Sequence, residues 1–164
     1  MRKLDFVVYG EPKGKGRPRF AKMGNIVTTY TDKETEIYEN KVMLSYKTMF
    51  NKVYKGTNDY LFPKGTYVSM QIDCYFSLNK GDYGKNGLNK NGREKISRTF
   101  CDKKPDIDNV IKAILDGLNG VAYTDDSQVV DISCSKCYTE LSPRVEIRMK
   151  EIGILKECNW YGTL

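Results

Sequence analysis

The segment from Tyr67 to Leu78 constrains the fold most, because apolar and polar residues alternate along its whole length. The apolar positions are Val68, Met70, Ile72, Cys74, Phe76 and Leu78. A period of two is typical of a β-strand with one buried side and one side that faces solvent. The sequence therefore predicts a strand here, with partner strands beside it and a layer of helix over its apolar face.

Shorter segments are expected to provide the partner strands. They are Leu4–Tyr9, Ile26–Tyr30, Val129–Tyr138 and Arg144–Lys150. Two helices are also predicted. Thr31 and Glu34 form a capping-box pattern that opens a helix running to about Tyr54. The second helix includes Ile111, Ile114, Leu115 and Leu118 at helical spacing and ends at Asn119–Gly120.

These elements predict an α+β fold, with a mixed or antiparallel sheet of about five strands and two main helices packed on it. We expect one domain over residues 1–164. The apolar segment near the N-terminus contains Asp5 and is too short for a signal sequence or a membrane span, so a cytoplasmic protein without membrane attachment is expected. The five cysteines, an odd number, are then expected to be reduced thiols.

The formal net charge of +6 is concentrated in two basic segments. Residues 11–22 carry +4 and residues 80–104 carry +5, so the rest of the chain carries −3. The region from Asn79 to Lys103 is rich in glycine, asparagine and basic residues and is predicted to be a long mobile loop inserted in the domain. Basic segments of this kind are typical of proteins that bind phosphate groups.

The chain contains no histidine. This excludes Ser-His-Asp triads, Cys-His pairs, zinc sites that use histidine and histidine general bases. Any catalysis must therefore depend on carboxylates.

Five aspartates lie in the run KPDIDNVIKAILDGLNGVAYTDDSQVV, residues 104–130, and four of them stand in two close pairs. Asp106 and Asp108 stand at the start of the second predicted helix, and Asp125 and Asp126 follow a turn before the next strand. One arrangement brings Asp106, Asp108 and one of the later pair to a single point. Three carboxylates at one point repel each other unless a cation neutralises them, and oxygen ligands alone favour Mg²⁺ or Mn²⁺.

A metal of this kind beside basic segments indicates hydrolysis of phosphodiesters. Lys112, at the rim, is positioned to stabilise negative charge in the transition state. Arg17 and Arg19, in the segment GKGRPRF, are candidates for clamping a nucleic-acid backbone.

A purely structural interpretation stays open. Asp106 or Asp108 is suited to cap the helix, and Asp108, Lys112 and Asp116 are spaced as an exposed ion-pair ladder. An EF-hand is excluded, because Val110 and Ile111 occupy its fifth and sixth positions. A restriction-type nuclease motif is excluded too, because no acidic-x-Lys tripeptide follows Asp106. The pair Cys134 and Cys137 lacks the second pair that a zinc knuckle needs.

The run at 104–130 resembles the signature of the RusA-type Holliday-junction resolvases, and GKGRPRF is similar to a segment of many members. The order of motifs matches from Gly10 to Lys150. The resemblance implies a Mg²⁺-dependent endonuclease, with Mn²⁺ as a substitute, that acts as a homodimer on branched DNA. It also implies that each protomer nicks one of two symmetric strands of a four-way junction, and that relatives are often carried by phages and prophages.

Carried over by position, the resemblance makes Asp106, Asp108 and Asp126 metal-binding catalytic acids and Lys112 the catalytic lysine. Asp125 matches a further acidic position among the metal ligands, and Asp116 is expected to be structural. The residues expected to position DNA are Lys13, Lys15, Arg17, Arg19, Lys90, Arg93, Lys95, Arg98, Lys103 and Lys104. The long basic insertion departs from compact members of the family.

Two other functions remain open on the sequence. A different metal-dependent flap or branch nuclease, or a phosphatase, would use the same acids. A non-catalytic DNA-binding protein would use only the basic segments.

Overall fold

A computed structural model describes residues 1–17, 19–23, 26–30, 32–55 and 60–153. For residues 19–23, 26, 27, 29 and 30 the description is limited to the backbone. The main sheet has four strands in the order β1-β8-β4-β7, formed by Lys3–Tyr9, Arg144–Ile152, Tyr67–Ser77 and Val129–Thr139. The pair β4 and β7 is parallel and the other pairs are antiparallel, so the predicted mixed sheet is confirmed.

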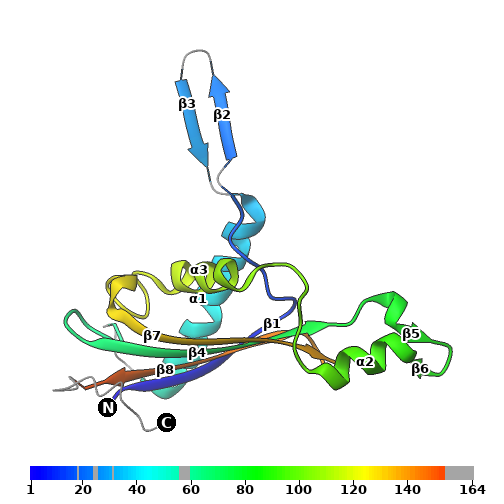
Figure 1. Ribbon diagram of the computed structural model, residues 1–164. Helices are drawn as coiled ribbons and strands as arrows, with labels where there is room; N and C mark the ends of the chain where they lie inside the picture. Colours follow the sequence, from blue (N-terminus) through cyan, green and yellow to red (C-terminus); the bar gives the residue numbers. More distant parts are fainter. Residues whose placement is uncertain (18, 24–25, 31, 56–59, 154–164) are drawn as a thin grey trace, which may run out of the picture.

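The predicted strand Ile26–Tyr30 is not part of the main sheet. It forms β3, which pairs with β2, Arg19–Met23, in a separate hairpin that projects from the body on the side of the helices (Figure 1). The main sheet therefore has four strands rather than about five.

The alternation in β4 places its apolar residues on the covered face of the sheet. Met70 stands between Met149 of β8 and Ile132 of β7, and both methionines are buried. Two helices, α1 at Lys33–Val53 and α3 at Ile107–Leu118, cover this face (Figure 1). The α+β prediction is confirmed in this arrangement.

The two helices approach closely where α3 carries Gly117. A Cβ atom there would lie 2.8 Å from the backbone oxygen of Glu39 in α1. Glycine is therefore required by the packing, because any larger residue would push the helices apart.

The ends of the helices correct one prediction and confirm another. α1 begins at Lys33 with Asp32 as its N-cap residue, and Thr31, the expected cap, lies outside the described residues. α3 ends as predicted: Asn119 is its C-cap, and Gly120 adopts a φ of +68°, which glycine tolerates without strain.

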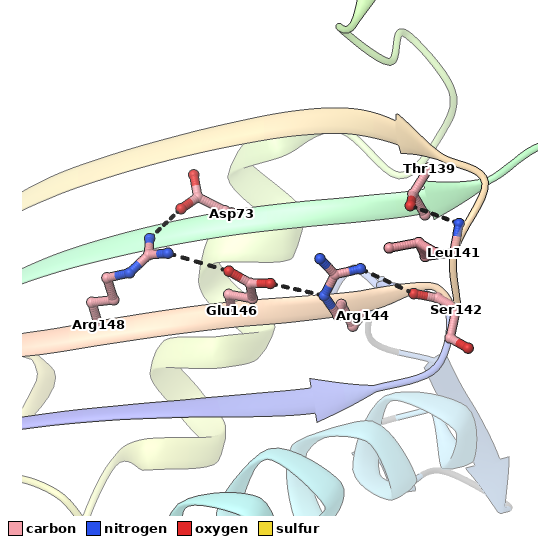
Figure 2. Close-up of polar contacts among 7 residues, drawn as sticks. All are labelled: Asp73, Thr139, Leu141, Ser142, Arg144, Glu146 and Arg148. Atoms are coloured by element: carbon pink, nitrogen blue, oxygen red, sulfur yellow. Dashed lines mark hydrogen bonds and ion pairs between the residues drawn. The ribbon is translucent and has the colours of Figure 1, made fainter. Parts of the chain in front are cut away.

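The opposite face of the sheet carries a chain of paired charges (Figure 2). Arg148 bridges Asp73 and Glu146, and Glu146 also accepts a hydrogen bond from Arg144 at 2.8 Å. Partial burial would raise the pKa of Asp73, but hydrogen bonds from Ser135 and Arg148 outweigh it and lower this pKa. The arginines of this face are therefore committed to carboxylates within the sheet.

The prediction that Asn79–Lys103 is a loop without packed elements is wrong. The chain there forms a folded arm that extends beyond the end of the sheet (Figure 1). The arm consists of a short 3-10 helix, η1, at Lys80–Asp82, a two-stranded ribbon, β5 at Tyr83–Gly84 and β6 at Gly87–Leu88, and the helix α2 at Lys90–Arg98.

An ion pair holds the arm together. The ammonium of Lys95 in α2 lies 2.8 and 2.9 Å from the two carboxylate oxygens of Asp82, which is only 4% exposed. Lys95 is also the main reason that the pKa of Asp82 is lowered. Gly92 completes the contact, because a Cβ there would lie 2.4 Å from the Asp82 backbone oxygen.

None of the helices in the described ranges is long and apolar enough to cross a membrane. Cys74, Cys101, Cys134 and Cys137 are free thiols, as expected, and Cys158 lies outside the described residues.

We expect Asp82→Ala to loosen the arm while the sheet stays folded. The substitution leaves the half-buried Lys95 without its partner, and segments with few other buried contacts open first. Limited trypsin digestion followed by mass spectrometry should show faster cleavage within residues 80–98. Glu94→Ala, which removes only the exposed pair with Arg98, is the control and should be cleaved like the wild type. Equal cleavage of the two variants would contradict the role given to Asp82.

Candidate active site

Asp106 is the N-cap residue of α3, with extended backbone angles of φ −66° and ψ 151°. Its side chain makes no capping hydrogen bond, so the capping interpretation fails for this residue. Instead the carboxylate accepts hydrogen bonds from the Lys104 ammonium at 2.7 and 2.6 Å. Lys104 is the main cause of the lowered pKa of Asp106, and the charge of Lys136 adds to it. The Asp106 carboxylate is therefore ionised, exposed and beside cations.

Asp108 and Lys112 lie one turn apart on the exposed side of α3. The Lys112 ammonium is 3.3 Å from an Asp108 carboxylate oxygen. The expected ion-pair ladder does not continue from Lys112 to Asp116, because Asp116 pairs with Lys15 instead. Helix packing explains the orientation, since Val110, Ala113, Ile114, Gly117 and Leu118 are buried on the other side.

The later acidic pair lies on a tight turn before β7. The turn contains a short 3-10 helix, η2, at Asp126–Gln128, and Asp125 caps it by accepting a hydrogen bond from the Ser127 backbone N–H at 3.0 Å. Hydrogen bonding from the Ser127 side chain, together with this backbone bond, lowers the pKa of Asp125. Asp126 is exposed and makes no side-chain hydrogen bond within the described part of the chain. Asp125 is thus committed to the turn, whereas Asp126 is available to a ligand.

Gln128 fixes this turn, although no role for it was expected from the sequence. Its side-chain oxygen accepts hydrogen bonds from the backbone N–H groups of Thr124 and Asp125 at 2.9 and 3.3 Å. Its amide nitrogen donates to the backbone oxygens of Phe62, Pro63 and Thr66. The signal was present in the DDSQV run, because a glutamine three residues after an aspartate completes a capping box.

The acids are not gathered as expected. Within the described ranges, no group of three aspartate, glutamate or cysteine side chains lies close enough together to hold a metal ion. The convergence of Asp106, Asp108 and one of the later pair is therefore not present in this structure. The donors suit magnesium chemically, because all are carboxylates, but their arrangement here does not form its site.

The basic loop at residues 13–17 lies directly against the start of α3. The Lys15 backbone N–H donates to the Asn109 oxygen at 2.8 Å. A Cβ on Gly14 would lie 2.7 Å from Pro105 Cβ and 3.0 Å from Asn109 Cβ. Two segments nearly a hundred residues apart therefore meet where Asp106 and Asp108 stand.

The side chain of Lys15 fixes this contact. Its ammonium hydrogen-bonds the Asp116 carboxylate and lies 3.7 Å from a carboxylate oxygen of Glu39 in α1. The hydrogen bond to Asp116 raises the pKa of Lys15, while burial raises the pKa of Glu39. Asp116 is structural, as expected, but Lys15 shares that structural role.

The residues expected to bind DNA fall into two groups. Lys13, Lys15, Lys95 and Lys104 are paired with carboxylates, Arg98 pairs with Glu94 on the surface of α2, and Lys103 is half-buried. Arg17, Lys90 and Arg93 are exposed, on the loop and on the arm. The side chain of Arg19 lies outside the described part of the structure.

Lys136 of β7 is a second residue near the site that the sequence did not single out. Its ammonium donates to the backbone oxygens of Lys103 and Pro105, immediately before Asp106. The available signal was its position in the strand: Lys136 has the same parity as Ile132 and Cys134, whose side chains pack against the core.

Residues 9–150 match the family described as Endodeoxyribonuclease RusA. The chain belongs to this family. Membership assigns endodeoxyribonuclease activity to it. The chain is also 30% identical over 150 residues to the uncharacterized protein YqaN of Bacillus subtilis strain 168, a match that covers 92% of this chain and 97% of YqaN.

We expect Gly14→Ala to displace the basic loop from α3. The added methyl group would overlap Pro105, and overpacking of this kind typically costs about 1–3 kcal/mol. The melting temperature and the affinity for DNA, measured side by side, should both fall. Gly81→Ala is a matched control in the basic arm, because a Cβ there meets nothing within 4 Å. If both variants behave like the wild type, the loop is not held by this contact.

Proposed function

We propose that this chain is a Mg²⁺-dependent endonuclease that resolves four-way DNA junctions, as a homodimer that makes paired symmetric nicks. The observation that carries the proposal is the contact between the basic loop and the acid-bearing start of α3, made through Gly14 and Lys15. This contact brings the basic loop beside the aspartates that are the proposed metal ligands, which supports a substrate that carries phosphate groups. Family membership supports the nuclease chemistry.

Asp106, Asp108 and Asp126 are the proposed ligands of Mg²⁺ or Mn²⁺, with Asp125 holding the turn that carries Asp126. Because the three carboxylates are not gathered in this structure, the proposal requires them to come together when the ion binds. Held by these carboxylates, such an ion would supply an activated water and would neutralise charge that develops on the phosphate oxygens. In the free protein, Lys104 lowers the pKa of Asp106. The pairs of Lys104 with Asp106 and of Lys112 with Asp108 reduce the repulsion between these carboxylates and an approaching phosphate. Lys112 is the proposed electrostatic stabiliser of the transition state.

The proposed path of the DNA backbone follows the exposed cations of the loop and the arm. Arg17 lies on the loop, and Lys90 and Arg93 lie on α2. The open face of the sheet is less suited to phosphate, because Arg144 and Arg148 are already paired with carboxylates (Figure 2). A two-fold dimer would present two such sites to the two equivalent strands of a junction.

Asp106→Asn, Asp108→Asn and Asp126→Asn should each lower junction cleavage by at least about a hundredfold, because several kcal/mol of charge stabilisation depend on the ligands. Junction binding should persist, since a negative charge near phosphate is removed. Asp125→Asn should lower the cleavage rate less than Asp126→Asn does, because the Asp125 carboxylate caps the turn. Asp5→Asn, on β1, is the control for a surface aspartate outside the site. Cleavage is measured by gel with Mg²⁺ titrated, and full activity of Asp126→Asn would contradict the ligand set.

A substrate panel tests the junction preference. Four-way junctions should be cleaved faster than flaps, duplex DNA or nucleotides. Preferred cleavage of flaps would identify a branch nuclease instead. Binding without cleavage at any Mg²⁺ concentration would identify a non-catalytic DNA-binding protein.

The salt dependence of junction affinity tests the proposed DNA path. Removal of one cation that binds a phosphate should reduce the slope of log K against log salt by about one. Lys90→Ala and Arg93→Ala should therefore flatten the slope, whereas Lys150→Ala, on β8, should leave it unchanged. Slopes equal to that of the wild type in all three variants would remove α2 from the interface.

A further inference from the structure

Lys136 occupies an unusual place for a lysine. It lies in the middle of β7, on the covered face of the sheet, opposite the buried Cys74 of β4. Lysine is rarely buried unless its ammonium has partners. Here the ammonium lies 5.4 Å from the ring centroid of Phe76 and donates to the backbone oxygens of Lys103 at 2.5 Å and Pro105 at 2.7 Å. Lys136 is half-buried, and its ammonium is engaged by two backbone oxygens beside an aromatic ring.

The chain that Lys136 holds connects the arm to α3. The backbone of this stretch also pairs with β7: the Cys101 N–H donates to the Lys136 oxygen at 2.9 Å, and the Tyr138 N–H donates to the Thr99 oxygen at 3.0 Å. Residues 99–101 are thus held by the strand's backbone, and residues 103–105 by the Lys136 side chain. Asp106 follows directly.

Lys136 differs from the other lysines near the acids. The side chains of Lys104 and Lys112 are 82% and 61% exposed and are free to turn toward a ligand. An ammonium has three protons, and Lys136 uses two of them on carbonyl groups. Its geometry suits an action on the backbone before Asp106 rather than on a phosphate.

We infer that Lys136 is a positioning residue for Asp106, which fixes the start of α3 by holding the backbone oxygens of Lys103 and Pro105. The inference rests on the proposed function, because there Asp106 is a metal ligand. Groups that orient a ligand in this way typically change metal affinity or activity by about tenfold to a hundredfold when they are removed.

The test compares Lys136→Met, Lys136→Arg and Lys150→Met with the wild type. Three quantities are measured: single-turnover cleavage of a four-way junction with enzyme in excess, junction affinity without divalent metal, and amide hydrogen exchange of residues 101–110. Lys136→Met should cleave about tenfold to a hundredfold more slowly, with junction affinity within about twofold of the wild type and faster exchange. Lys136→Arg should recover most of the cleavage rate, because a guanidinium can donate to both carbonyls. Lys150→Met, a surface control, should match the wild type.

Two results would overturn the inference. One is unchanged cleavage and exchange in Lys136→Met. The other is a loss of junction affinity as large as the loss of cleavage, which would make Lys136 a phosphate contact. If Lys136→Met does not fold, Lys136→Gln, which keeps two amide protons, is judged by the same measurements. Should the wild type cleave no branched DNA, the proposed function fails, and hydrogen exchange alone still decides whether Lys136 holds this segment.

Discussion

The burial of one side of α3 is the constraint on which the site depends. Ile114 and Leu118 are completely buried, and removing side chains of this size from water stabilises a fold by about 1.5–3 kcal/mol each. A rotation of the helix would expose them. The side with Asp108 and Lys112 is therefore held outward, and Gly117 sets the distance to α1 at which this packing is possible.

Two basic segments approach this helix by different routes. The loop of Gly14 and Lys15 reaches it from β1 and is fastened by Asp116. The arm reaches it through the stretch that lies along β7 and contacts Lys136. Lys15, which the sequence suggests for DNA binding, and Lys136, to which it assigns no role, both bind partners within the protein. Fewer cations of these segments than the sequence suggests are therefore exposed without a carboxylate partner.

Hydrophobic periodicity predicted the elements that have one buried side and one exposed side. The strand β4 and the helix α3 have apolar residues at regular spacing, so their type and limits could be found from the sequence. The arm has no such period, because Asp82, Lys95 and Gly92 hold it by an ion pair and one close contact. The sequence places Asp106 and Asp108 at the start of α3 and Asp125 and Asp126 on the turn before β7, as the structure has them, but their spacing does not determine which cation each one faces. For that reason the pairing of Lys15 with Asp116 could not be predicted, and the expected meeting of three carboxylates is not present in the described ranges.

The parallel pairing of β4 and β7 determines where this fold can accept extra chain. Parallel neighbours must be joined by a crossover, and here the crossover includes the arm, α3 and the turn with η2. The entropy of closing a loop grows only with the logarithm of its length, about 0.6 kcal/mol for each doubling. A folded substructure inserted between Ser77 and α3 therefore adds little to the entropy cost of closing the crossover. The register of the sheet is set by other contacts. The arm is an accessory that the architecture accommodates at small thermodynamic cost.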